Sequence, residues 1–257
     1  LNKNSSIFDV DLKIDSVFGF STYTKKANRN QVIIHPNGID SFYAAGNAVV
    51  RLTGRKQSEI LTGHSGPVAC LTINREGTLL ISAQANPEKS YSMLRIWKIH
   101  FSDQFYNISH TTCVSNYRIP HTDLSAMAIS YDNSMLAALG KLKAGIQYIL
   151  LWDISNVCDK GDVRVFAKST VNNSTAGSIE GLLFIKHLNK LITYGYHLSK
   201  DDLQDDENIQ RDQGSCLKMW SIRSGSLTCT NLDILAKPEI CSFKHGNKNH
   251  FEHKYKT

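Results

Sequence analysis

His64 is the histidine of this chain whose setting most invites a catalytic interpretation. It follows Gly63 in the segment LTGHSGP, and a general base there would need a nucleophile and an orienting acid nearby. Neither stands at a recognisable spacing, and the motifs G-x-S-x-G, G-x-G-x-x-G and H-E-x-x-H and the P-loop are missing from the sequence. We therefore interpret His64 as a turn residue that bonds within its own structural unit, and we predict no catalytic residue.

A second group has the residue types of a zinc site. Cys241, His245, His250 and His253 form a C-x3-H-x4-H-x2-H run. Thiolate and imidazole ligands suit tetrahedral zinc, and four of them would be enough. The run lies in a stretch rich in lysine and asparagine, which favours a polar tail. We predict no metal and no other cofactor.

Two charged clusters are candidates for binding a partner protein. Lys25, Lys26 and Arg29 stand beside Tyr23 and could approach an acidic surface, although ordinary solubilising charge is the simpler interpretation. The second cluster is an acidic link that lacks the spacing and the glycine of an EF-hand, so a solvated loop that could dock a basic surface is expected. Its members are Asp201, Asp202, Asp205, Asp206 and Glu207.

The elements that would position these residues follow a repeated pattern. Apolar residues recur three times at i, i+3 and i+5, with a further one seven residues later, and each set is followed by an apolar run that ends in tryptophan. Self-similarity at a period of about 55–70 residues is typical of a stacked or radial array. The sets are Val68, Leu71, Ile73 and Leu80; Leu124, Met127, Ile129 and Leu136; and Ile179, Leu182, Phe184 and Leu191; the tryptophans are Trp97, Trp152 and Trp220.

Each unit offers four short segments rich in Val, Ile, Leu and Thr, without helical periodicity. A four-stranded unit repeated around an axis is a propeller blade. We predict an all-β chain with a lead-in segment at 1–15, blades over 16–243 and a polar tail at 244–257. About four blades are present, with a fifth beginning at Pro238, so part of a larger propeller is preferred over a closed ring of four or five blades. The second unit should end in an outer strand at 116–119.

Composition limits the function classes. The chain has 257 residues, 41% of them hydrophobic, and a formal net charge of +6, as expected of a globular protein without a dense basic stripe for nucleic acid. No apolar run is long enough to span a membrane, and no signal peptide is recognised. The six cysteines include no C-x-x-C pair, which fits a reducing cytosol. A chain that starts at Leu1 is expected to be a fragment or a processed product.

Two dipeptides resemble the WD-repeat pattern: Gly63-His64 opens a unit, and Trp152-Asp153 closes one. In WD repeats a histidine, a serine or threonine, an aspartate and the tryptophan form a hydrogen-bonded chain within the blade. The resemblance places His64, Ser82 and Trp97 in this chain and gives His121 the role of His64 in the third unit. The aspartate position falls in the long link QANPEKSYS, so the chain should be incomplete and packing should stabilise more of each blade.

A closer resemblance extends over Val17 to Trp152. The order Val17-Phe18-Gly19-Phe20, then HPNG, then LTGHSGPVACLTI and RIW is similar to that of the echinoderm microtubule-associated-protein-like proteins. It is also similar to WD-repeat proteins of cilia, flagella and centrioles. These resemblances imply a non-enzymatic scaffold that binds tubulin or other axonemal proteins, located in the cytoplasm at the cytoskeleton, in an axoneme or a centriole.

Two other functions remain open from the sequence. One is a general WD-repeat adaptor in a soluble cytosolic complex, which would not pellet with polymerised tubulin. The other is a propeller enzyme such as a hydrolase, which would need polar residues converging at the central channel. Neither nucleic acid nor a membrane is an expected partner.

Overall fold

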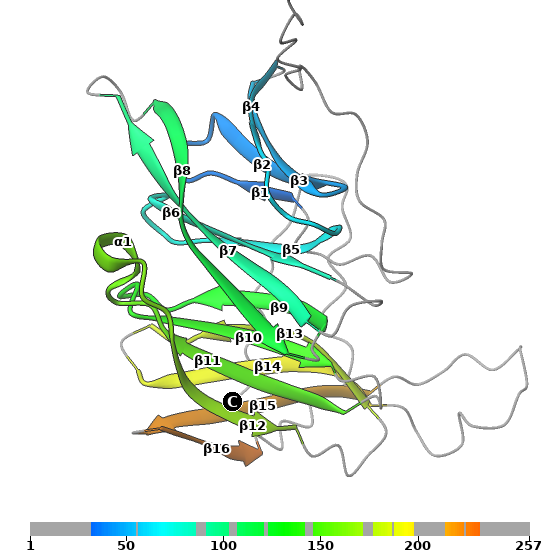
Figure 1. The fold of residues 1–257 in the computed structure, drawn as a ribbon. Coiled ribbons are helices and arrows are strands. Elements are labelled where there is room, and N and C mark those ends of the chain that lie inside the picture. The colour runs from blue at the N-terminus through cyan, green and yellow to red at the C-terminus, as the bar shows by residue number, and fades with distance from the viewer. Residues whose placement is uncertain are drawn as a thin grey trace, which may run out of the picture.

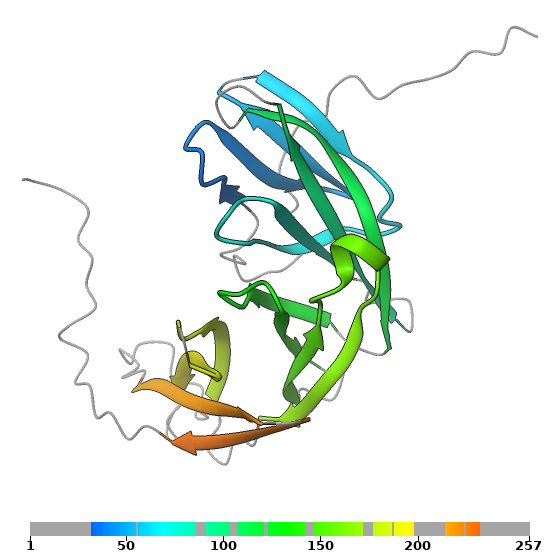
Figure 2. The ribbon, with the colours of Figure 1, turned by 90° about the vertical axis from the view of Figure 1, so that its left-hand side faces the viewer.

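The computed structural model describes residues 32–54, 56–85, 91–102, 107–120, 123–141, 146–171, 177–186, 188–197, 214–223 and 225–231. These residues form four antiparallel sheets of four strands each, and every sheet uses consecutive strands in chain order. The sheets follow one another along an arc, with their inner strands toward its centre (Figure 2). The prediction of an all-β chain with about four blades is confirmed.

The strands alternate in direction along the chain (Figure 1). The first sheet contains β1 (Val32–Ile34), β2 (Asp40–Ala45), β3 (Ala48–Thr53) and β4 (Lys56–Leu61). The second contains β5 (Val68–Ile73), β6 (Leu79–Gln84), β7 (Tyr91–Phe101) and β8 (Ile108–Pro120). The third contains β9 (Asp123–Ile129), β10 (Met135–Lys141), β11 (Gln147–Asp153) and β12 (Arg164–Thr170). The fourth contains β13 (Gly177–Phe184), β14 (Lys190–His197), β15 (Gly214–Arg223) and β16 (Ser226–Asn231).

Two predicted details were wrong. The outer strand of the second sheet begins at Ile108, not at Asn116, because β8 pairs with β7 from Phe101 back to Tyr91. The described residues also include one short helix, α1 (Val157–Lys160), where no helix was expected. Gly161 ends α1 with a φ of 69°, a left-handed conformation in which glycine is favoured.

The first hairpin of each of the first three sheets turns in the same way. Gly38, Gly77 and Asn133 occupy the same turn position with φ of 71°, 74° and 61°. In the second sheet Gly77 N–H donates to the carbonyl of Asn74 at 3.1 Å, and Asn74 N–H donates to the carbonyl of Leu79 at 2.9 Å. Positive φ favours glycine and tolerates asparagine, so the local sequence sets these turns.

The repeated apolar residues have a common role in packing. Val68, Leu71 and Leu80 lie in one buried cluster with Phe42 of the first sheet. The matching residues of the third sheet pack on the second sheet, and those of the fourth pack on the third. Since successive strand residues point to opposite faces, Ile81 contributes to the next cluster along the chain. Each repeated set therefore marks the face that a sheet turns toward its predecessor.

Candidate functional site: tryptophan-centred bonds and linked hairpin turns

The second sheet brings together three of the residues that the sequence singled out. Trp97 Nε1 donates to Ser82 Oγ at 2.8 Å, and Ser82 Oγ lies 2.7 Å from His64 Nε2. Trp97 comes from β7 and Ser82 from β6, while His64 lies in the segment that leads from β4 to β5. These contacts tie the entry to the second sheet to its two middle strands.

His64 is buried, and one of its ring nitrogens, Nδ1, forms no hydrogen bond with the described residues. Burial, together with the positive charge of Arg95, lowers the pKa of His64 to about 4, although the Gln84 side chain opposes the shift. The imidazole is therefore neutral at pH 7.

Trp220 in the fourth sheet has a corresponding bond, whereas Trp152 in the third does not. Trp220 Nε1 donates to Thr193 Oγ1 at 2.9 Å. Thr193 and Ser82 each stand two residues beyond the residue that pairs with the tryptophan. Ala138 holds that place in the third sheet and has no hydroxyl. As a result, Trp152 Nε1 is buried without a partner in the described part of the chain.

Two further repeat residues, Gly63 and Asp153, lie in or beside connections between strands. Gly63 has a φ of 123°, and its carbonyl accepts a hydrogen bond from Arg95 Nη2 at 2.6 Å. A Cβ at Gly63 would lie 2.5 Å from Arg95 Cζ, so a larger residue would displace the Arg95 side chain, and the positive φ itself favours glycine. Asp153 Oδ1 accepts from Ser155 N–H at 2.9 Å and from Ser155 Oγ at 2.7 Å. These bonds hold the pKa of Asp153 below its ordinary value.

The other candidate residues lie outside the described part of the chain. This holds for His121, for the basic cluster Lys25, Lys26 and Arg29, and for the Cys241-containing run. It holds as well for the acidic link with Asp201, Asp202, Asp205, Asp206 and Glu207.

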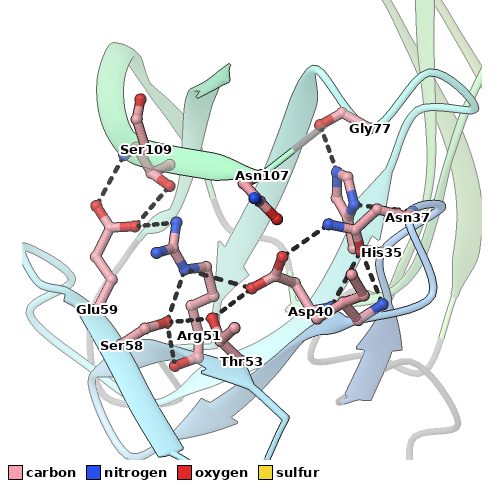
Figure 3. A network of polar contacts seen from close by, with 12 residues as sticks. His35, Asn37, Asp40, Arg51, Thr53, Ser58, Glu59, Gly77, Asn107 and Ser109 are labelled. Carbon is pink, nitrogen blue, oxygen red and sulfur yellow. Dashed lines mark hydrogen bonds and ion pairs between the residues drawn. The ribbon is translucent and has the colours of Figure 1, made fainter. Parts of the chain in front are cut away.

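A buried polar network that sequence reasoning missed occupies the first sheet (Figure 3). Arg51 on β3 donates from Nε to Ser58 Oγ at 2.8 Å, and its Nη1 lies 3.2 Å from Glu59 Oε2 as an ion pair without hydrogen-bond alignment. Asp40 accepts from Thr53 Oγ1 at 2.6 Å and lies 3.8 Å from Arg51 Nε. Two carboxylates thus compensate one buried guanidinium. The sequence feature that could have indicated this network is Arg51, an arginine inside the apolar run AVVRL.

This network continues into the second sheet. The Glu59 carboxylate accepts from the backbone N–H of Thr111 at 2.8 Å and from Thr111 Oγ1 at 2.9 Å. At the hairpin turns, His35 Nε2 lies 3.0 Å from the carbonyl oxygen of Gly77 (Figure 3). The first two sheets are therefore joined at the outer strands and again at the turns.

The same row of turns continues across the other sheets. Asn133 Nδ2 donates to Glu76 Oε2 at 2.9 Å, which links the second turn to the third. Arg75 hydrogen-bonds Tyr131, and the Arg75 guanidinium and Lys186 Nζ lie 4.6 Å and 4.7 Å from the Tyr131 ring centroid. Lys186 belongs to the fourth turn. Side chains thus connect the four turns in sequence along one edge of the arc.

These polar contacts do not assemble a reaction centre. Ser82 and His64 have the spacing of a nucleophile and a base, but Ser82 is fully buried and no acid of the described chain orients Nδ1 of His64. Burial raises the pKa of Cys70 to about 12, which leaves its thiol unreactive. Within the described residues, no group of three or more His, Cys, Asp or Glu side chains is arranged to hold a metal ion. The same residues contain no helix long and apolar enough to cross a membrane.

The chain has relatives among characterised sequences. No protein-family model matches it. It is 29% identical over 113 residues to WD repeat-containing protein 90 of Xenopus tropicalis, covering 44% of this chain and 6% of that protein. The mouse protein of the same name is 26% identical over 163 residues, covering 62% of this chain and 8% of that protein. The chain therefore matches less than a tenth of the length of these relatives.

Solved structures share the architecture at low sequence identity. The β-propeller domain of Myceliophteria thermophila Cps50 (Swd1) has a TM-score of 0.51 at 10% identity, covering 76% of this chain and 53% of that one. A chain of Kuenenia stuttgartiensis hydrazine synthase has a TM-score of 0.50 at 12% identity, covering 77% and 52%. Because the second is a synthase, the shared architecture does not by itself separate catalysis from binding. The shared architecture identifies the fold as a β-propeller, of which the described residues form four blades, and the sequence relatives are WD-repeat proteins.

Proposed function

We propose that this chain is a non-enzymatic scaffold that binds other proteins and is associated with microtubules or the axoneme. The observation that carries the scaffold proposal is the continuous row of hairpin turns, in which His35 and Gly77, Glu76 and Asn133, and Arg75, Tyr131 and Lys186 fix each turn to the next. A row of mutually braced turns offers partners a surface whose side chains are already ordered, which lowers the entropy lost on binding.

The choice of binding over catalysis is supported by how the polar side chains are used. Arg51 pairs with both Asp40 and Glu59, and Glu59 also accepts a hydrogen bond from the next sheet. Ser82, which lies beside a buried histidine, is inaccessible to a substrate. In the described residues these polar groups therefore serve contacts within a blade and between blades, and they do not line an open site as the groups of a hydrolase would.

The microtubule assignment is supported by the resemblance of Val17–Trp152 to microtubule-associated and axonemal WD-repeat proteins and by the formal charge of +6. A positively charged chain is attracted to an acidic polymer surface, and this attraction weakens as salt rises. The basic cluster Lys25, Lys26 and Arg29 is the proposed contact.

Co-sedimentation of the full-length protein with polymerised tubulin tests this assignment. We expect pelleting at low salt that falls as salt is raised, and that is reduced several-fold when Lys25, Lys26 and Arg29 are changed to alanine together. Lys141→Gln, a single exposed charge removed elsewhere, is the control and should pellet like the wild type. If the wild type stays in the supernatant at low salt, the microtubule assignment fails and a general adaptor in a soluble cytosolic complex takes its place.

A further inference from the structure

A hollow of about 320 Å³ opens between the hairpin turns of the third and fourth sheets. Tyr131, Asp132 and Met135 line it from the third sheet, and Phe184 and Leu188 line it from the fourth. An engineered apolar cavity of about 150 Å³ is enough to take up benzene, so this hollow has room for one large apolar side chain. It lies on the same edge as the row of turns.

The floor of this hollow is apolar and partly open to solvent. Leu188 is 52% exposed, Met135 and Phe184 are half-buried, and the lining residue Ile222 is 7% exposed. A side chain that entered would cover leucine and phenylalanine surface now in contact with water, and burial of apolar surface favours association. The floor therefore suits an aliphatic or aromatic residue.

Two cationic side chains with unused hydrogen-bond donors, Arg75 and Lys186, lie beside the hollow. Both side chains lie against the Tyr131 ring. Among the residues that the structure describes, neither cation forms an ion pair. A guanidinium has five N–H donors and an ammonium has three, so most of their donors remain available to a carboxylate.

The acidic residues of the rim are already engaged. Asp132 accepts hydrogen bonds from Ser130 Oγ and from both N–H and Oγ of Ser134, and these bonds keep its pKa low. Glu76 accepts from Asn133 and from Asn74. Asp132 and Glu76 keep their negative charges, but their oxygens already accept these hydrogen bonds. A partner carboxylate would therefore be recognised by the unused N–H donors of Arg75 and Lys186.

We propose that this hollow binds an extended acidic segment of a partner protein. One large apolar side chain of the segment fills the space between Met135, Phe184 and Leu188. An adjacent carboxylate pairs with Arg75 and Lys186, which Tyr131 holds at the rim. The proposal rests on the proposed function only in that it takes the chain to be a protein-binding scaffold, and it names the chemistry of one contact.

Fluorescence anisotropy with the full-length protein tests this site directly. The probe is a short fluorescein-labelled peptide with one leucine among glutamates. Three matched peptides replace the leucine by glycine, the glutamates by glutamine, or the glutamates by lysine. We expect the acidic leucine peptide to bind at low salt, and each matched peptide to bind at least tenfold more weakly.

Variants of exposed residues then locate the contact. Arg75→Gln and Lys186→Gln should each weaken binding several-fold and reduce its salt dependence, whereas Leu188→Ser should weaken binding without changing that salt dependence. Lys141→Gln is the matched control, because Lys141 ends β10 at the opposite end from Met135. Circular dichroism should give the same spectrum for all four variants, since each changed side chain is exposed.

Three results would contradict the proposed site. All four peptides could bind equally, the acidic leucine peptide could fail to bind, or Arg75→Gln could have the same effect as Lys141→Gln. Peptide binding without microtubule pelleting would overturn the microtubule assignment alone. If the protein pellets with microtubules but does not bind the acidic leucine peptide, only the proposal for the hollow is contradicted.

Discussion

At the scale of single residues, the three tryptophans differ in how their indole nitrogens are satisfied. Trp97 and Trp220 each donate to a hydroxyl on the neighbouring strand, but Trp152 faces Ala138 and has no acceptor among the described residues. A buried donor without a partner carries a desolvation penalty of about 1–3 kcal/mol. The third blade therefore lacks an indole hydrogen bond that the second and fourth blades have.

The substitution Ala138→Ser should supply this missing bond. A serine hydroxyl at this register position would match that of Ser82 beside Trp97. We therefore expect the free energy of unfolding to rise by about 1 kcal/mol. Ala137→Ser is the control, because Ala137 is equally buried but points to the opposite face, where its hydroxyl would be unpaired and would destabilise the protein. Urea unfolding of both variants measures the difference. If the two serines have the same effect, Trp152 does not gain a bond.

His64 makes stability depend on pH in a direction set by its lowered pKa. Its pKa is about 4 in the folded chain, against the ordinary histidine value of 6.5 that applies once the chain is unfolded. Above pH 6.5 both states are neutral and the stability is fully present. Between pH 6.5 and 4 only the unfolded chain takes up a proton, so this contribution is lost as the pH falls.

From these values the loss amounts to about 2 kcal/mol by pH 5. His64→Gln removes the titrating group, so the variant should lose about that much less stability than the wild type between pH 7.5 and pH 5. Urea unfolding at the two pH values measures this double difference, in which the other titrating groups cancel. Identical losses in the two proteins would show that the pKa of His64 is not lowered in the folded chain.

At the scale of elements, the hairpin turns both shape each blade and join it to the next. Gly38 and Gly77 have nearly the same φ at the same turn position, yet a Cβ at Gly38 would meet no atom of the described residues within 4 Å and a Cβ at Gly77 would lie 2.2 Å from His35 Nε2. Substituting each glycine by alanine therefore distinguishes two losses of stability. The change at Gly38 adds backbone strain alone, and the change at Gly77 also disturbs a contact between blades.

Gly38→Ala should destabilise the protein by about 1 kcal/mol, the strain of a left-handed alanine. Gly77→Ala should destabilise it by at least about 1 kcal/mol more, since His35 must also move from the carbonyl of Gly77. Thermal and urea unfolding of the two variants provide the comparison. Equal losses would mean that the contact between His35 and Gly77 adds nothing to stability.

Glu59 offers a second test of the joint between the first two blades. Glu59→Ala would remove the acceptor of two Thr111 bonds and one of the carboxylates that compensate the buried Arg51, so we expect a loss of about 3 kcal/mol. In the background Arg51→Leu the same change should cost less, because no buried cation is then left uncompensated. A double-mutant cycle measures this coupling, and additive losses would contradict it.

The elements were far more predictable from the sequence than the contacts between them. The spacing Val68, Leu71, Ile73 and Leu80 repeats because one face of every sheet must pack on its predecessor, and such a face leaves a local signature. The bond from Glu59 to Thr111 joins residues 52 positions apart on different sheets and leaves none. The missing bond of Trp152 could have been found by aligning Ala138 with Ser82, since both lie two residues beyond a repeated leucine.

At the scale of the whole molecule, the stacking of sheets determines which apolar surfaces meet solvent. The fourth sheet packs Leu182, Leu191 and Trp220 against the third. Its other face carries Leu183, which is 45% exposed, and Tyr194, which is 37% exposed. Ile192 and Met219 pair in register beside Leu183 and are only partly buried, so these side chains form one apolar patch across three strands.

This patch should make the 257-residue chain, expressed by itself, associate with itself as its concentration rises. Leu183→Lys places a charge in the middle of the patch and should shift association to several-fold higher concentration, with thermal stability nearly unchanged. Val165→Lys is the control: Val165 is 57% exposed, but it lies on β12, the outer strand of the third sheet. Sedimentation velocity over a concentration series distinguishes the two variants. An equal shift for both would show that added charge opposes association wherever it is placed, whereas a shift for Leu183→Lys alone would assign the contact to the outward face of the fourth blade.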